Sequence, residues 1–127
     1  MTAEINKPGR TGVTRIIWAT KYSAQGISAA WKNEAAFRQE LILMSLMLPA
    51  AFWLGQTAVE RIALITPLFI VVIVELLNSA IEAVVDRVSA EKHELSGRAK
   101  DMGSAAVLFA LGLVVLSWGC IAAQRFL

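Results

Sequence analysis

Three long apolar stretches constrain this chain more than any other feature of its sequence. The clearest is 102–124, in which 23 consecutive residues carry no charge. Because about 20 apolar residues are enough for a helix to cross a bilayer, we expect transmembrane helices at about 35–54, 62–85 and 102–124. Hydrophobic residues make up 57% of the chain, which is more than most soluble domains contain. The sequence therefore predicts an all-α, polytopic membrane protein.

The N-terminal region differs in character from the apolar stretches. Residues 1–11 contain a proline and a glycine and no apolar pattern, so we expect a flexible tail. Residues 12–31 mix aliphatic and aromatic side chains with basic ones, which is typical of an amphipathic helix on the membrane surface. A soluble amphipathic helix packed on the other helices is the alternative. Residues 12–127 are expected to form a single domain, since 127 residues are few for two.

The basic residues are distributed unevenly between the two sides of the expected helices. Ten of the 12 Lys and Arg residues lie in residues 1–38 or in the polar connection 86–101, and only Arg61 and Arg125 lie on the opposite side. By the positive-inside rule, we expect the N-terminus and the connection 86–101 to be cytoplasmic and the C-terminus to be outside. The net charge of +2 is too small to indicate binding to nucleic acid.

The stretch "VELLNSAIEAVVDRV", residues 74–88, places acids on an otherwise apolar helix. At 100° per residue, one stripe contains Glu75, Ser79, Glu82 and Asp86, and Asn78 flanks it. A charged acid at the bilayer centre costs about 2.5–3.5 kcal/mol, so these side chains are expected to face the bundle interior or a polar cavity. A polar contact between helices is the alternative explanation. Glu82 is expected about 6 Å below the inner surface and Glu75 about 16 Å below it.

Two kinds of chemistry explain carboxylates at this boundary. One is proton or cation transport, and the other is a reaction between a water-soluble reagent and a lipid headgroup. Glu34 precedes the first span and Lys100 and Asp101 precede the third, which suits Mg²⁺ and a polyphosphate, because Mg²⁺ takes one or two carboxylates and phosphate oxygens. Neighbouring residues on a helix do not face each other, so Lys100 and Asp101 are expected to find other partners. Neither of the common glycine-rich phosphate-binding motifs is present.

Four strings in the sequence carry a resemblance to a known family. They are "GVTRIIWATKYS", "AAWKNEAAFRQE", "VELLNSAIEAVVDRV" and "HELSGRAKDMGSAAV", and together they resemble the bacterial integral-membrane diacylglycerol kinases over about residues 12–110. The resemblance implies transfer of the γ-phosphoryl group of Mg-ATP to diacylglycerol, giving phosphatidic acid and ADP, by a homotrimer in the bacterial inner membrane, with active sites between subunits and the C-terminus in the periplasm. The related undecaprenol kinases and a small proton or cation transporter are the alternatives.

The resemblance also implies roles for individual residues. Glu75 resembles the general base, with Asn78 beside it, and Glu34 and Glu82 resemble the ligands of Mg²⁺. The positions that resemble the nucleotide site are Arg15, Tyr22, Glu34, Glu82, Glu91, Lys92, His93, Glu94, Leu95, Lys100 and Asp101. The positions that resemble lipid contacts are Arg15, Ala19, Ala30, Trp31, Glu75 and Ser104.

Overall fold

The protein is all-α, as its apolar stretches predict. The computed structural model describes residues 11–127, and the expected tail 1–11 lies almost entirely outside this range. Within the described residues there are four helices and no strand. The helices are α1 (Gly12–Asn33), α2 (Ala35–Leu54), α3 (Ala58–Val88) and α4 (Glu94–Phe126). The last three are long and apolar enough to cross a membrane, which confirms the prediction of three transmembrane helices.

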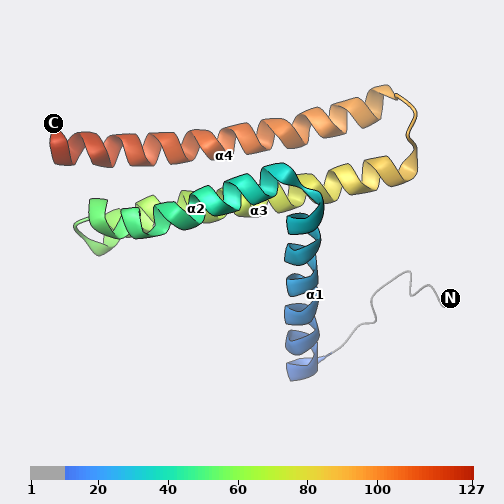
Figure 1. Cartoon of the computed structure of the whole chain (residues 1–127), viewed down its shortest axis with the longest axis horizontal. Coiled ribbons are helices and arrows are strands. Elements are labelled where there is room, and N and C mark those ends of the chain that lie inside the picture. The colour runs from blue at the N-terminus through green and yellow to red at the C-terminus, as the bar shows by residue number, and fades with distance from the viewer. Residues whose placement is uncertain (1–10) are drawn as a thin grey trace.

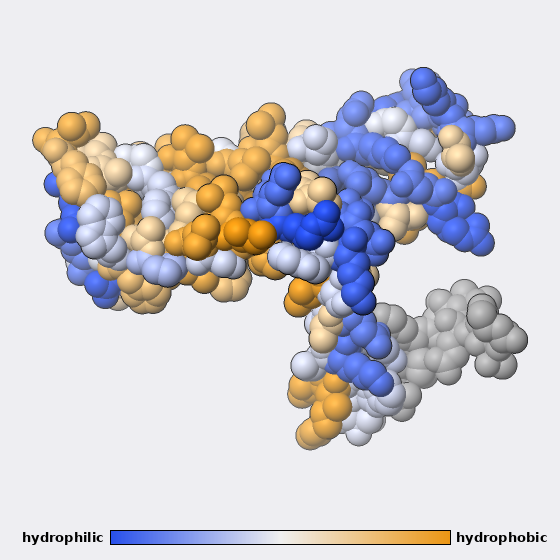
Figure 2. Space-filling view, viewed as in Figure 1, coloured by the Kyte–Doolittle hydropathy of each residue, from blue (hydrophilic) through white to orange (hydrophobic). Residues whose placement is uncertain are grey.

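The three long helices lie side by side, and α1 projects away from them (Figure 1). α3 and α4 form a long antiparallel hairpin, and α2 packs mainly against α3. Apolar side chains cover most of these three helices in Figure 2, whereas polar side chains gather at the α3–α4 connection and at the corner where α1 meets α2. Large apolar side chains such as Phe69 and Phe109 are 56% and 77% exposed in the single chain. Such a surface requires lipid or other protein to cover it.

The corner between α1 and α2 is a single residue. Glu34 has an extended backbone, with φ −120° and ψ 105°, and separates two helices that otherwise follow each other directly. The Arg38 guanidinium of α2 donates hydrogen bonds to the carbonyl oxygens of Trp31, at 2.7 Å, and Lys32, at 3.4 Å. These carbonyls end α1 and lack partners within the helix, so Arg38 stabilises the corner. The surface helix expected over 12–31 extends to Asn33.

The turn between α2 and α3 is shorter than predicted. The second span was expected to begin at 62, but α3 begins at Ala58, because a capping box stabilises its first turn. In this box the Thr57 hydroxyl accepts a hydrogen bond from the Glu60 backbone N–H at 3.2 Å, and the Glu60 carboxylate accepts one from the Thr57 N–H at 3.1 Å. The Arg125 guanidinium of α4 donates to the carbonyl oxygens that end α2, including that of Leu54 at 3.0 Å.

The prediction of a polar connection over 86–101 was wrong for most of that range. α3 continues to Val88 and α4 begins at Glu94, so only 89–93 are non-helical. The imidazole Nδ1 of His93 accepts a hydrogen bond from the Leu95 backbone N–H at 3.1 Å and caps α4. An ion pair between Glu94 and Arg98, at 3.1 Å, supports the first turn. Polar composition alone did not distinguish a loop from the exposed ends of two long helices.

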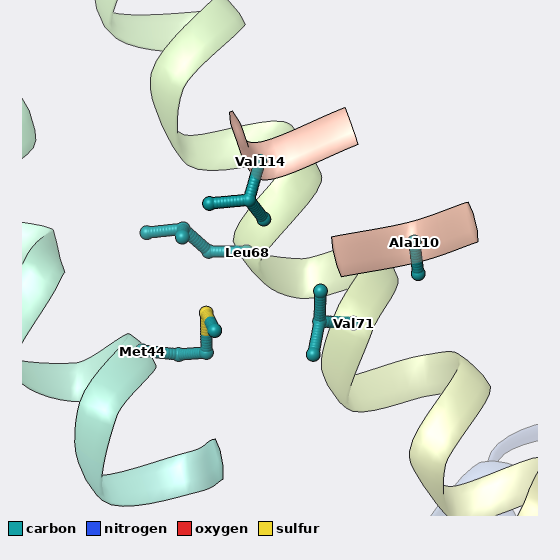
Figure 3. Close-up of a cluster of buried hydrophobic side chains, with 5 residues drawn as sticks. All are labelled: Met44, Leu68, Val71, Ala110 and Val114. Atoms are coloured by element: carbon teal, nitrogen blue, oxygen red, sulfur yellow. The ribbon is translucent and has the colours of Figure 1, made fainter. Parts of the chain in front are cut away.

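The core is formed where α3 contacts both of its neighbours. Met44 of α2, Leu68 and Val71 of α3, and Ala110 and Val114 of α4 form one buried cluster (Figure 3). A second cluster lies nearer the α2–α3 turn and consists of Ala51, Leu54, Leu64 and Ile121. Between helices in a membrane, association depends on such close packing, because lipid tails are as apolar as the side chains themselves.

Candidate functional site

The deeper part of the acid stripe of α3 faces the inside of the molecule. Glu75 and Asn78 are 5% and 8% exposed, and among the described residues they are the buried polar or charged side chains. Glu82, one turn beyond Asn78, is half-buried. Glu75 and Asn78 therefore face the interior as expected, whereas Asp86, the last acid of the stripe, is exposed. A buried carboxylate in a membrane-spanning helix is costly and usually belongs to a functional site.

Asn78 and Glu82 are directly connected. The Asn78 amide Nδ2 donates a hydrogen bond of 3.2 Å to the Glu82 carboxylate Oε1, between residues one helical turn apart. This bond orients the amide, because only its nitrogen can donate. The Asn78 Oδ1 is buried and has no hydrogen-bond partner among the described residues. A buried amide oxygen without a hydrogen-bond partner is rare in folded proteins.

Glu40 of α2 belongs to the same acidic group, although it was not among the predicted site residues. Its carboxyl group lies near that of Glu75, and the Glu82 carboxyl group is the next acidic neighbour of Glu75. The Glu40 Oε2 is buried and, within the described part of the chain, has no hydrogen-bond partner. Its position close to the start of the first apolar stretch was the available signal, since a charged residue there must lie near a surface or inside a bundle.

Glu34 lies at the edge of a pocket between α1 and α3. The pocket has a volume of about 470 Å³ and is mainly apolar. Its lining residues are Ser23, Gly26, Ile27, Ala29, Ala30, Asn33, Glu34, Leu76, Ser79, Ala80 and Ala83. Most of these side chains are small, so the pocket is an apolar space beside the Glu34 carboxylate. Of the residues expected to contact lipid, Ala30 lies in this pocket, and Glu75 lies on the same helix one turn before Ser79.

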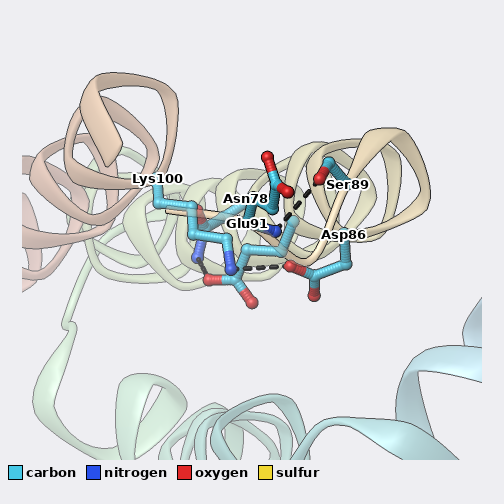
Figure 4. Close-up of polar contacts among 6 residues, drawn as sticks. Asn78, Asp86, Ser89, Glu91 and Lys100 are labelled. Atoms are coloured by element: carbon cyan, nitrogen blue, oxygen red, sulfur yellow. Dashed lines mark hydrogen bonds and ion pairs between the residues drawn. The ribbon is translucent and has the colours of Figure 1, made fainter. Parts of the chain in front are cut away.

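A second pocket lies at the α3–α4 connection and brings together five of the expected nucleotide-binding residues, namely Glu91, Lys92, His93, Glu94 and Lys100. Its volume is also about 470 Å³. Its lining residues are Val85, Asp86, Ser89, Ala90, Glu91, Lys92, His93, Glu94, Ser96, Gly97 and Lys100. Leu95 and Asp101 are adjacent in sequence but are not among them. Figure 4 shows Asp86, Ser89, Glu91 and Lys100 converging from the two helices and the connection.

Lys100 crosses this second pocket to reach α3. Its Nζ lies 2.7 Å from the Asp86 Oδ1, and both side chains remain partly exposed, at 44% and 64% (Figure 4). The expectation that Lys100 finds a partner other than Asp101 is therefore confirmed. Because the pair is open to solvent, an anionic ligand can reach the ammonium group.

Several expected site residues stay apart from these pockets in the single chain. Arg15, Ala19 and Tyr22 lie in the first half of α1, and none of them lines either pocket. Trp31, at 41% exposure, and Ser104 of α4 point to the surface. α1 extends away from the three long helices, so its first turns lie far from the α3–α4 connection (Figure 1). Within one chain, only some of the expected site residues therefore lie close together.

Comparison with known proteins shows which family this chain belongs to. The family model described as "Prokaryotic diacylglycerol kinase" matches residues 21–122. The protein named diacylglycerol kinase in Escherichia coli K12 is 60% identical over 111 residues, which cover 87% of this chain and 90% of that protein. Its namesake in Haemophilus influenzae is 53% identical over 87% of this chain and 94% of that protein, and the one in Pseudomonas aeruginosa is 51% identical over 89% and 92%. The chain belongs to the prokaryotic diacylglycerol kinase family.

Proposed function

We propose that this protein transfers the γ-phosphoryl group of ATP to the free hydroxyl group of diacylglycerol, giving phosphatidic acid and ADP. The observation that carries the proposal is the position of the buried Glu75 on α3. It lies in the apolar part of that helix, seven residues before Glu82, and the polar pocket begins at Val85. The same helix thus reaches from a depth suited to a lipid headgroup to a pocket suited to a soluble nucleotide, about 15 Å further on.

In this mechanism Glu75 acts as the general base. It accepts the proton of the lipid hydroxyl group while the hydroxyl oxygen attacks the γ-phosphorus. The bond between the γ-phosphorus and the oxygen that bridges it to the β-phosphate breaks, and ADP leaves with the bonding electrons. Such reactions depend mainly on positioning and on stabilising negative charge, and helices can supply both. Asn78 contributes by holding Glu82 through the bond of its Nδ2.

Glu34 and Glu82 would hold the Mg²⁺ that accompanies ATP. The described residues contain no group of three His, Cys, Asp or Glu side chains suited to a metal. Two carboxylates nevertheless fit Mg²⁺, because phosphate oxygens and water complete its coordination. Glu34 makes no capping hydrogen bond at the start of α2, so its side chain remains available. The bound cation would neutralise negative charge on the β- and γ-phosphates.

The pocket at the α3–α4 connection would bind the nucleotide. Residues 91–94 would supply polar groups for the adenosine part, and Lys100 would supply a cation for the phosphates. Leu95 and Asp101, which follow Glu94 and Lys100 in the sequence, would add further contacts to the nucleotide. Lys100 forms an ion pair with the exposed Asp86. Phosphate oxygens would therefore displace the Asp86 carboxylate from the Lys100 ammonium group.

A homotrimer would complete the site. Arg15, Ala19 and Tyr22 of one subunit are separated from the pockets of the same chain, but α1 projects outward and can reach a neighbouring subunit. Such an arrangement would bring Arg15 and Tyr22 to the nucleotide, and Arg15, Ala19, Ala30, Trp31 and Ser104 to the lipid. We propose that residues 12–127 form one kinase domain in the bacterial inner membrane. In this topology α1 lies on the cytoplasmic surface, the α3–α4 connection is in the cytoplasm and the C-terminus is in the periplasm.

The proposal is tested with purified protein in lipid–detergent micelles. Mg-ATP is supplied with either diacylglycerol or undecaprenol, and phosphate incorporated into lipid is measured. We expect phosphatidic acid as the main product. Equal or greater turnover of undecaprenol would overturn the choice of substrate. Ion flux in sealed vesicles without ATP, together with no lipid product, would overturn the kinase proposal as a whole.

A further inference from the structure

Gly103 is a buried glycine of α4 that lies directly against Asn78 of α3. A Cβ atom built on Gly103 would lie 2.1 Å from the Asn78 Oδ1 and 3.2 Å from its Cγ. The first distance is far shorter than any contact between carbon and oxygen atoms in proteins, so every other residue at 103 forces Asn78 to move. Atoms so close would repel strongly, because packed interiors have little room to give.

The backbone of Gly103 gives no other reason for a glycine. The residue lies inside a regular helix, and Gly12 is the glycine with positive φ among the described residues. Glycine is unfavourable in a helix relative to alanine. Gly112 and Gly119 lie on the same helix, and a Cβ atom on either would meet nothing within 4 Å in the described chain. The close approach to Asn78 is therefore specific to Gly103.

The contact constrains the Asn78 amide from one side while Glu82 constrains it from the other. The amide nitrogen donates to the Glu82 Oε1 at 3.2 Å, so the amide oxygen must face α4. The backbone of Gly103 occupies the space beside that oxygen. The Asn78 Oδ1 is buried there and has no hydrogen-bond partner within the described range, so no other bond of that oxygen holds the amide in place.

We propose that Gly103 is a positioning residue, which acts by leaving the space that lets Asn78 hold Glu82. This inference rests on the proposed function, in which Asn78 and Glu82 belong to the catalytic site. A methyl group at 103 would rotate the Asn78 amide away from α4 and break its bond to Glu82. The Glu82 carboxylate would then lose its orientation, although neither Asn78 nor Glu82 had been replaced.

The test combines Gly103→Ala with Asn78→Ala. Turnover of diacylglycerol and the midpoint temperature of unfolding are measured in micelles for wild type, both single variants and the double variant. Gly103→Ala should lower kcat by about 10²-fold, as expected when a reacting group is displaced by about an ångström. Gly112→Ala and Gly119→Ala make the same chemical change on the same helix, and they should leave kcat unchanged.

The Asn78→Ala variant distinguishes an effect of Gly103→Ala that acts through Asn78 from a general effect on the stability of α4. In Asn78→Ala the Oδ1 and Cγ atoms are gone, and the remaining Cβ would lie 3.8 Å from a Cβ at 103, an ordinary contact. Gly103→Ala should therefore lower the unfolding temperature of the wild type, but raise that of Asn78→Ala, because alanine favours the helix. It should also cause no further loss of residual turnover in that background.

Three results would overturn the inference. They are wild-type kcat in Gly103→Ala, an equal fall of the unfolding temperature in both backgrounds, and an equal further loss of turnover in Asn78→Ala. If Gly103→Ala fails to fold, a folded double variant supports the inference and an unfolded one overturns it. Absence of lipid phosphorylation by the wild type would overturn the proposed function, while the unfolding temperatures would still decide whether Gly103 acts through Asn78.

Discussion

Lys100 of α4 and Asp86 of α3 form an ion pair of 2.7 Å across the pocket at the α3–α4 connection (Figure 4). The two residues are 14 positions apart and belong to different helices. The pair therefore links the two arms of the helical hairpin at the place where we propose that nucleotide binds. A ligand that carries phosphate groups must compete with the Asp86 carboxylate for the same ammonium group.

The first prediction concerns this competition. Asp86→Asn should lower KM for ATP by about two- to fivefold, the range expected when an exposed ion pair is removed, because Lys100 becomes free for phosphate. The measurement is steady-state phosphorylation of diacylglycerol over a range of ATP concentrations. Glu60→Gln is the control, since it also removes one acidic charge from α3 but lies outside the pocket. An unchanged or higher KM in Asp86→Asn would contradict the competition.

The second prediction concerns the proposed base. Glu75→Gln keeps the size of the side chain but replaces the carboxylate by an amide, which cannot accept the proton of the lipid hydroxyl group. We expect kcat to fall by about 10²–10⁴-fold, with KM for ATP nearly unchanged, because the nucleotide pocket does not include Glu75. Glu60→Gln, at the opposite end of α3, should leave kcat at the wild-type value. Turnover of Glu75→Gln close to that of the wild type would remove Glu75 as the base.

The third prediction concerns Gly55, the buried residue of the turn between α2 and α3. A Cβ atom on Gly55 would lie 2.8 Å from the Arg61 Cγ and 3.0 Å from the Ala51 carbonyl oxygen. The φ of Gly55 is −77°, so lack of space and not backbone conformation excludes other residues. Gly55→Ala should lower the free energy of unfolding by about 1–3 kcal/mol, as overpacking does. Thermal unfolding in micelles measures the change, and a stability equal to that of Gly119→Ala would contradict it.

The fourth prediction concerns the hydrogen bond that joins α4 to α3 near Pro67. The Trp118 Nε1 donates to the Leu64 carbonyl oxygen at 3.0 Å, in the turn that precedes this proline. Trp118→Phe keeps an aromatic ring but removes the donor. It should lower the free energy of unfolding by about 0.5–1.5 kcal/mol and leave kcat unchanged, because Trp118 lies outside both pockets. Thermal unfolding and turnover of the same preparation test both parts. A fall in kcat at unchanged stability would contradict the prediction, because it would mean that the contact between Trp118 and Leu64 affects the distant catalytic end of α3.

The class of fold could be predicted from the sequence because it depends on local properties. Apolar length alone indicates a membrane-spanning helix, and all three expected stretches lie in helices of the required length. The acid stripe was also visible, since helical periodicity places Glu75, Glu82 and Asp86 on one face. Those two regularities were enough to predict that Glu75 turns inward, and it is buried as expected.

The ends of the helices were predicted less well, because hydropathy does not record capping. The Thr57 and Glu60 side chains begin α3 four residues before the apolar stretch, and the His93 imidazole begins α4 eight residues before its own. Both caps are local patterns of side chains with backbone N–H groups. A search for capping residues, and not only for apolar runs, would have found them.

The sequence by itself determined that this chain forms three membrane-spanning helices and that one of them carries acids on an inward face. Only the tertiary structure decided which groups meet there: Glu40 beside Glu75, Lys100 beside Asp86, and Gly103 against Asn78. The physical reason is that periodicity is a property of one helix, whereas each of these contacts depends on how far a second helix is shifted along and rotated about its axis. That register is set by close packing among small and large side chains far apart in the sequence.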